Sequence, residues 1–251
     1  LTEPFFGAGS VSFDGTGDHL LVDTSTSFDY GTNDFTIEFW WYRTSNDRQA
    51  LFHGSWGQDW SIGIDFNGSA NNQKLGMWAS SSGTSWDMLI ADAGGNGITT
   101  GTPALNQWSH IAYVRNGSDF QLYLNGTSVG QVTNSSAINS KTTTRQQAIG
   151  AWWNSEIAMS DVHGYLSNYR IVIGSALYTS NFTPPTTQLT NIPGTVLLTC
   201  QGNTIADASA NNFTITVNGN AAPTDDGPTH NAAGYWEFAT SGSQSDGFTG
   251  D

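Results

Sequence analysis

Short runs in which apolar and polar residues alternate, separated by turns rich in Gly and Asn, constrain the fold of this chain more than any other feature. The run FTIEFW, residues 35–40, alternates cleanly, and a period of two predicts a β-strand with one buried side. The stretch WSHIAYVRNGSDFQLYLNGTSVG, residues 108–130, contains two such runs around the turn Asn116-Gly117, which is the pattern of a hairpin. No long amphipathic helical pattern accompanies them, so the chain is predicted to be all-β. The predicted strands are 11–13, 19–22, 35–40, 60–66, 75–77, 111–114, 120–124, 148–150, 166–173, 196–200 and 212–217.

Turns and prolines organise these strands into sheets. An Asn67-Gly68 turn is predicted to join two of them. Pro184, Pro185 and Pro193 predict a surface crossing, because proline cannot donate a hydrogen bond inside a central strand. Each sheet would have one apolar face, and burial of both faces predicts an antiparallel two-sheet sandwich. The hairpin is expected to pack this sandwich through Trp108, Ile111, Tyr113, Leu122 and Leu124.

The charge balance limits the partners that the chain can bind. Charged residues make up 11% of the 251 residues, and the formal net charge is −14, with Lys74 and Lys141 as the only lysines. A phosphate backbone or an anionic membrane surface would be repelled, so neither nucleic acid nor membrane insertion is expected. No apolar run approaches the ~20 residues of a membrane helix. The acidity is compatible with a bound divalent cation.

The cysteine count and one internal echo bear on the organisation of the chain. Cys200 is the only cysteine, so no intrachain disulfide can form, and its apolar surroundings predict a buried, unreactive thiol. The motif GSVSF at residues 9–13 is echoed by GYWEF at residues 234–238. We therefore expect residues 1–222 to form the sandwich, and residues 223–251 to supply a closing strand near the N-terminus or to open a second copy.

A family resemblance supports this fold. Four segments, in this order, resemble the laminin-G-like branch of the concanavalin A-like lectin/glucanase superfamily, which implies a jelly roll of two large antiparallel sheets. More narrowly, ALYTSNFTPPT followed by LLTCQGNTIADASANNFTITVNGNAAPT is similar to modules carried on bacteriophage structural proteins, which implies a place on the virion surface or tail. The four segments are SVSFDGTGDHLLV at 10–22, FTIEFWWY at 35–42, the hairpin at 108–130 and GYLSNYRIVIGSALYTSNFTPPT at 164–186.

Because that superfamily includes glycanases, the acidic residues decide whether the sequence predicts hydrolysis. Hydrolysis of a glycosidic bond needs two carboxyl groups, ~5 Å or ~6.5–9.5 Å apart. The superfamily's retaining glucanases carry Glu-x-Asp-x-Glu or a close variant, and this chain contains no such run. Glu38 stands alone among aromatic residues, and we expect it to form a salt bridge with Arg115 or Arg170. The sequence therefore predicts no catalytic residues and a protein that is not an enzyme.

Tryptophans in loops are the candidates for sugar recognition, because a pyranose ring can stack its apolar face on an indole. Trp40, Trp60 and Trp108 fall in strand patterns and are expected in the core or on a sheet face. The alternative for the loop tryptophans is that they cap sheet edges or are buried against a sister subunit. The candidate glycan-binding residues are Trp56 in HGSWGQDW, Trp86, and Trp152 and Trp153 in AWWNSEIAMSD.

Calcium is the cofactor that the family resemblance implies. A hard cation takes carboxylate, amide and carbonyl oxygens from loops, and two stretches of this chain offer them. Neither stretch has the spacing of an EF-hand, and a plain solvated turn remains the alternative for each. The candidate ligands are Asp65 and Asn67 in DFNG, and Asn154, Glu156 and Asp161 in the loop before residue 164.

Three functions from different classes are compatible with these observations. The first is a non-catalytic module of a phage virion that decorates the particle or attaches it to host-surface glycans. This function predicts other virion subunits as partners and a homo-oligomer or larger assembly. The second is a bacterial secreted or cell-surface carbohydrate-binding domain with the same fold, which would be extracellular. The third is a glycanase, which the absence of paired acids disfavours.

Overall fold

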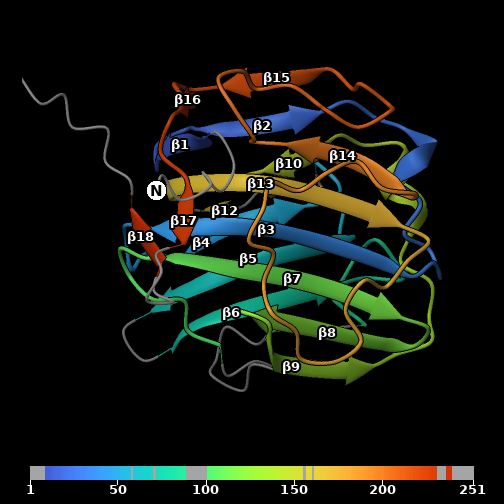
Figure 1. Ribbon diagram of the computed structural model, residues 1–251. Coiled ribbons are helices and arrows are strands. Elements are labelled where there is room, and N and C mark those ends of the chain that lie inside the picture. The colour runs from blue at the N-terminus through green and yellow to red at the C-terminus, as the bar shows by residue number, and fades with distance from the viewer. Residues whose placement is uncertain are drawn as a thin grey trace, which may run out of the picture.

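The computed structural model describes residues 9–57, 59–69, 72–88, 101–154, 157–159, 161–230 and 236–238. Two large antiparallel sheets face each other, as the alternating runs predict, and the short 3-10 helices η1 (Thr26–Phe28) and η2 (Ser140–Thr143) lie in the connections (Figure 1). Within the described ranges, no helix has both the length and the apolar character needed to cross a membrane.

The strands fall into two large sheets and two short pairs. The larger sheet has eight strands and the other has six. The eight-stranded sheet runs β16 (Ala222–Thr224), β1 (Ser10–Asp14), β13 (His163–Ile173), β3 (Phe35–Arg43), β7 (Trp108–Asn116), β8 (Asp119–Leu124) and β9 (Thr127–Thr133), with β14 (Thr195–Thr199) also paired to β13. The six-stranded sheet runs β15 (Ile215–Asn218), β2 (His19–Val22), β10 (Gln147–Ile149), β4 (Gln49–His53), β5 (Ile62–Ser69) and β6 (Asn72–Ala79). The short pairs are β11 (Trp152–Asn154) with β12 (Ile157–Met159), and β17 (Pro228–His230) with β18 (Trp236–Phe238).

Aromatic side chains join the two sheets through the core. The ring of Trp41 in β3 lies 5.5 Å from that of Phe66 in β5, and the ring of Tyr169 in β13 lies 6.4 Å from that of Phe52 in β4. The thiol of Cys200 is buried in the same cluster, as predicted, and burial raises its pKa to about 12. The predicted core face of β3 is confirmed, because Phe35, Ile37 and Phe39 are all fully buried in this cluster.

The hairpin of residues 108–130 is a wall of the sandwich, with one exception. Ile111, Tyr113 and Leu122 lie in the core, as predicted, and Leu124 packs at its edge. Trp108 does not pack the core with them; it lies on the sheet face, the other position expected for it, in a separate cluster with Trp40. Strand parity explains this placement, since an even-numbered residue of β7 points away from the face that carries the odd-numbered Ile111 and Tyr113.

The strands near the middle of the six-stranded sheet differ from the sequence prediction. The predicted turn at Asn67-Gly68 was wrong, because β5 continues to Ser69 and remains paired with β6 throughout. Strand β4 was missed, because a bulge after Ala50 places both Leu51 and Phe52 in the core and breaks the alternation. Strand β16 includes residues on both sides of the predicted division after residue 222, and it pairs with β1 and extends the eight-stranded sheet to Thr224.

The segment between β13 and β14, residues 174–194, crosses the outer face of the eight-stranded sheet, and we call it the strap (Figure 1). Its rings at Tyr178 and Phe182 are stacked 3.6 Å apart and pack on the buried Tyr123 of β8. The amide of Phe182 donates to the carbonyl of Gly126 at 2.9 Å. A Cβ at Gly126 would collide with the Phe182 carbonyl, so this close approach requires glycine. The predicted surface crossing at the prolines is therefore confirmed.

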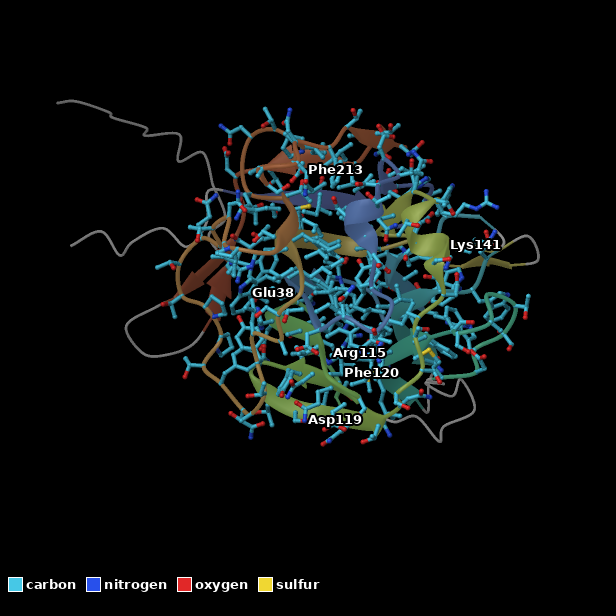
Figure 2. All side chains as sticks on the ribbon, turned by 90° about the vertical axis from the view of Figure 1, so that its right-hand side faces the viewer. Glu38, Arg115, Asp119, Phe120, Lys141 and Phe213 are labelled. Atoms are coloured by element: carbon cyan, nitrogen blue, oxygen red, sulfur yellow. The ribbon has the colours of Figure 1, made fainter. Side chains whose placement is uncertain are left out.

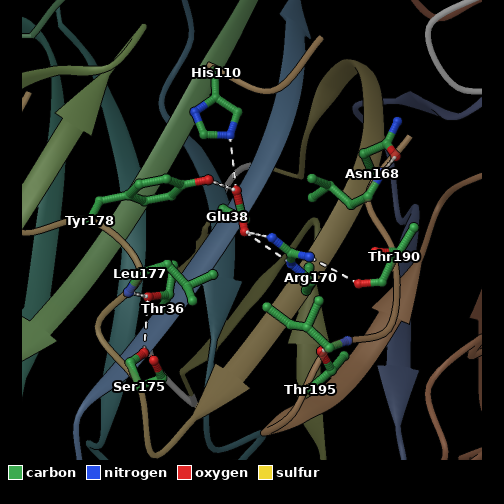
Figure 3. Close-up of polar contacts among 12 residues, drawn as sticks. Thr36, Glu38, His110, Asn168, Arg170, Ser175, Leu177, Tyr178, Thr190 and Thr195 are labelled. Carbon is green, nitrogen blue, oxygen red and sulfur yellow. Dashed lines mark hydrogen bonds and ion pairs between the residues drawn. The ribbon is translucent and has the colours of Figure 1, made fainter. Parts of the chain in front are cut away.

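Glu38 lies beneath the strap and is fully buried (Figure 3). Arg170 donates to its Oε1 from Nη2 at 2.6 Å and from Nε at 3.0 Å. Tyr178 of the strap donates to Oε2 at 2.7 Å, and His110 Nε2 lies 3.3 Å from the same oxygen. Burial opposes ionisation of Glu38, but hydrogen bonds and charges from His110 and Arg170 outweigh it and lower its pKa.

Of the two expected partners of Glu38, Arg170 is therefore the one observed. Arg115 instead points into the sandwich, where its guanidinium lies 4.8 Å from the centre of the Phe120 ring. It donates hydrogen bonds to the carbonyls of Gly31 and Ser136. Figure 2 shows Arg115 next to Phe120 and apart from Glu38. Strand parity again separates the two arginines, since they lie on opposite faces of the sheet.

Replacing the carboxylate in Glu38→Gln leaves the Arg170 guanidinium buried without a counter-charge, and we expect a loss of about 3 kcal/mol in unfolding free energy at pH 7. Because folding lowers the pKa of Glu38, its contribution is present above the usual value of 4.5 and is lost as the pH falls through the folded-state pKa. Urea denaturation between pH 7 and pH 3 should therefore give a shallower acid dependence for the variant. The control is Asp225→Asn, at an exposed carboxylate. Equal losses in the two variants would contradict the role assigned to Glu38.

Candidate functional site

The six-stranded sheet carries aromatic and polar side chains on its outer face. Phe52 and Ile64, which pair across β4 and β5, both point into the core. Their neighbours His53 and Gly63 therefore belong to the outer face, and Gly63 pairs in turn with Trp78 of β6. This row of outward positions is the floor of the candidate site.

Four tryptophans meet on this floor, and we call Trp60, Trp78, Trp86 and Trp152 the tryptophan cluster. Trp86 is central, because its ring lies 4.9 Å from Trp60, 5.5 Å from Trp78 and 5.0 Å from Trp152. Trp78 and Trp152 are only 7% and 6% exposed, whereas Trp60 and Trp86 are partly exposed. The cluster is separate from the sandwich core and lies on the opposite side of the sheet.

Trp152 lies flat against the sheet because two residues beneath it allow this. Its indole stacks on the buried imidazole of His53 at 4.6 Å, with only 8° between the ring planes. A Cβ at Gly63 would approach the Trp152 ring to 2.8 Å, so a larger residue in this position would displace the indole. The sequence named Trp152 as a candidate glycan-binding residue without assigning it to a face, and the structure places it, nearly buried, on the outer face of the six-stranded sheet.

Asp65, a predicted metal ligand, has another role in the structure. It is buried in β5, where its Oδ1 accepts a hydrogen bond from Trp78 Nε1 at 2.8 Å and its Oδ2 lies 3.0 Å from Arg48 Nη2. Burial raises the pKa of Asp65, although Arg48 and Trp78 partly offset this effect. Asp65 lies within a strand and not in a loop, and both of its carboxylate oxygens are engaged, so it holds the Trp78 indole in place.

Trp56 lies beside an open hollow at one end of the same sheet. Its ring stacks on His19 of β2 at 4.8 Å. The hollow has a volume of about 670 Å³, and it lies where β2 and β4 end and β10 begins. Arg145 on its wall is paired with Asp59, Nε to Oδ2, at 2.8 Å. The lining residues are Asp23, Thr24, Trp56, Gly57, Thr144, Arg145 and Gln146.

The remaining predicted ligands that the structure describes, Asn67 and Asp161, lie apart in other interactions. Asn67 lies within β5 opposite Lys74, whose ammonium group disfavours a bound cation. Asp161 accepts a hydrogen bond from the Gly17 amide, and burial and the charges of Asp18 and Asp14 raise its pKa. Across the described ranges, no three His, Cys, Asp or Glu side chains are grouped so that they could hold a metal ion. Glu156 and the side chains of Trp153 and Asn154 lie outside the described residues.

Sequence reasoning missed three residues of this face: His53, Trp60 and Trp78. Trp60 was expected in a strand covering residues 60–66, but it precedes the start of β5, so strand alternation does not reach it. The sequence did contain a signal for Trp78. In KLGMWA, residues 74–79, alternation places this tryptophan on the face opposite to that of Leu75 and Met77.

Comparison with known proteins relates the whole arrangement to one superfamily. A laminin-G-like family model, described as Concanavalin A-like lectin/glucanases superfamily, matches residues 14–177. No match is found among curated proteins.

Two solved structures of low sequence identity share the fold. A proposed carbohydrate-binding protein from Bacteroides ovatus has a TM-score of 0.61 and 15% identity, over 89% of this chain and 61% of that one. The chain thus spans less than two thirds of the length of the Bacteroides protein. A heptameric SAP-like pentraxin from Limulus polyphemus has a TM-score of 0.51 and 17% identity, over 84% of this chain and 94% of that one.

Burial lowers the pKa of His53 from 6.5 to about 3, and the charge of Asp59 only partly opposes this. As the pH falls below 6.5, His53 therefore binds a proton in the unfolded chain but stays neutral in the folded chain. The free energy of unfolding decreases as the pH falls from 6.5 toward 3. His53→Phe keeps a ring beneath Trp152 and removes this proton uptake. Between pH 6 and pH 4.5 we expect the variant to lose less stability per pH unit, by up to about 1.4 kcal/mol. Urea unfolding over this range measures the slope, and an unchanged slope would contradict a neutral, buried His53.

Proposed function

Because this chain belongs to the concanavalin A-like lectin/glucanases superfamily, we propose that it is a non-catalytic carbohydrate-binding module that binds sugar in the Trp56 hollow. The observation that carries the proposal is a partly exposed indole, held in place by stacking on His19, beside an open polar hollow. A sugar ring needs both an aromatic surface for its C–H face and polar groups for its hydroxyls.

The wall of the hollow supplies the polar groups. Asp23 offers acceptors, Arg145 offers donors, and the amide of Gln146 offers both. Thr24 and Thr144 add hydroxyl groups that can donate or accept. This mixture matches the hydroxyls of a sugar, each of which donates and accepts.

The placement of the acidic residues supports binding over hydrolysis. Glu38 is enclosed under the strap by Arg170, Tyr178 and His110, and its lowered pKa keeps it ionised. Asp65 is engaged by Arg48 and Trp78. A glycosidase needs a protonated acid and a second carboxylate on either side of an open cleft.

The fold shared with a proposed carbohydrate-binding protein of Bacteroides ovatus supports the bacterial secreted or cell-surface setting among those that the sequence predicts. A virion role, with other virion subunits and host-surface glycans as partners, stays a prediction of the sequence resemblance. Assembly into homo-oligomers and a requirement for calcium also stay predictions.

A glycan array probed with the purified protein tests the proposal, in calcium and in chelator. We expect binding to a defined class of sugar, and we expect Trp56→Ala to weaken it by about tenfold or more, because a central aromatic contact is removed. The matched control is Tyr165→Ala, a partly buried ring on the outer face of the other sheet. Loss of binding in chelator would support calcium.

Two results would count against the proposal. A folded wild-type protein that binds no glycan in either condition would refute the function itself. A Trp56→Ala variant that binds as tightly as the wild type would move the site away from the hollow.

A further inference from the structure

We infer that the tryptophan cluster and the Trp56 hollow form one continuous binding face for an uncharged linear polysaccharide, an inference that rests on the proposed function. The chain itself connects the two parts. Trp56 borders the hollow, Trp60 belongs to the cluster, and Asp59 stands between them in the sequence. A glycan that fills the hollow would therefore extend over the cluster.

Asp59 also connects the two parts in space. Its carboxylate pairs with Arg145 on the wall of the hollow at 2.8 Å. Its charge also acts on His53, the residue on which Trp152 is stacked. The ion pair is therefore within electrostatic reach of the floor of the cluster.

The cluster is held rigidly enough to serve as a binding platform. Asp65 fixes the indole nitrogen of Trp78 at 2.8 Å, and Arg48 holds Asp65 from the other side. Gly63 leaves the space in which Trp152 lies flat. A preformed surface loses little conformational entropy when a ligand binds, and this favours affinity.

The cluster also remains open to solvent where a ligand would reach it. Trp78 and Trp152 form its nearly buried base, while the rings of Trp86 and Trp60 are partly exposed above them. This arrangement offers two indoles beyond the hollow, so the face can stack more than one sugar ring. Affinity should therefore rise with the length of the glycan.

The negative charge of the protein favours an uncharged ligand over an acidic one. The formal net charge is −14, and Asp23 stands on the wall of the hollow. The two arginines of this face are already matched, Arg145 by Asp59 and Arg48 by Asp65. An acidic polysaccharide would meet net repulsion here.

The test measures affinity against glycan length. Oligosaccharides of one to six residues, cut from the neutral polysaccharides cellulose, xylan, mannan and β-1,3-glucan, are titrated calorimetrically into the wild type, Trp56→Ala, Trp86→Ala and the Tyr165→Ala control. Alginate and polygalacturonate oligosaccharides provide the acidic arm. Wild-type affinity should rise about tenfold or more between the shortest bound sugar and the hexasaccharide, with no binding in the acidic arm.

The two aromatic variants should separate the two parts of the face. Trp86→Ala should retain the affinity for the shortest sugar and lose the gain with length, whereas Trp56→Ala should weaken every length. If near-UV circular dichroism shows that Trp86→Ala is misfolded, Trp60→Ala takes its place. Trp86→Phe, which keeps an aromatic ring, should show part of the increase in affinity with glycan length.

The outcomes distinguish this inference from the proposed function. The extended binding face would be overturned if the wild type bound short and long glycans equally, or if Trp86→Ala kept the full increase in affinity with glycan length. Either result would leave the proposed function intact. Tighter binding of the acidic oligosaccharides would overturn the charge argument. No binding of any glycan by the wild type would refute both the function and the inference.

Discussion

Each of the two sheets is apolar on one face only, and exclusion of water from these two faces is the interaction on which the structure depends. The contact of Trp41 with Phe66, and that of Tyr169 with Phe52, join the sheets directly. Apolar burial contributes roughly 25 cal/mol per Å², so this aromatic interior accounts for much of the driving force. Once the inner faces are buried, the two outer faces are the surfaces of the sheets that remain to be covered or to contact a ligand.

One outer face is covered by the chain itself, and the other is open. The strap covers that of the eight-stranded sheet, and a buried carboxylate at Glu38 is tolerated there because Arg170, Tyr178 and His110 surround it. The outer face of the six-stranded sheet instead presents indole rings and a hollow with polar walls. The covered face stabilises the fold, and the open face is available to a ligand.

Polar residues on the open face support its aromatic residues. Asp65 has the chemistry of a metal ligand in the sequence, but in the structure it orients Trp78 and neutralises Arg48. Asp59 likewise neutralises Arg145 at the hollow. A carboxylate beside an indole N–H and a guanidinium is a positioning group, and this explains how an acidic chain can present a surface suited to an uncharged ligand.

The sequence by itself determined the elements whose cause is local. A period of two identified the core face of β3 through Phe35, Ile37 and Phe39, and it identified the hairpin strands β7 and β8. The sequence predicted an arginine partner for Glu38 but left Arg115 and Arg170 open, and Arg170 is the partner because the register of β13 places it directly opposite. The alternation also contained the correct face of Trp108, since parity alone separates it from Ile111.

Only the tertiary structure decided which distant residues meet. The bulge that breaks alternation in β4, and the continuation of β5 past Asn67-Gly68, are settled by pairing with neighbouring strands. The tryptophan cluster joins residues from 60 to 152, and its contacts depend on the register of β5 with β6 and on the path of the loops. Alternation has a range of a few residues, whereas this cluster is assembled from several strands and loops, so the sequence could identify Trp86 and Trp152 as candidates but could not bring them together with Trp60 and Trp78.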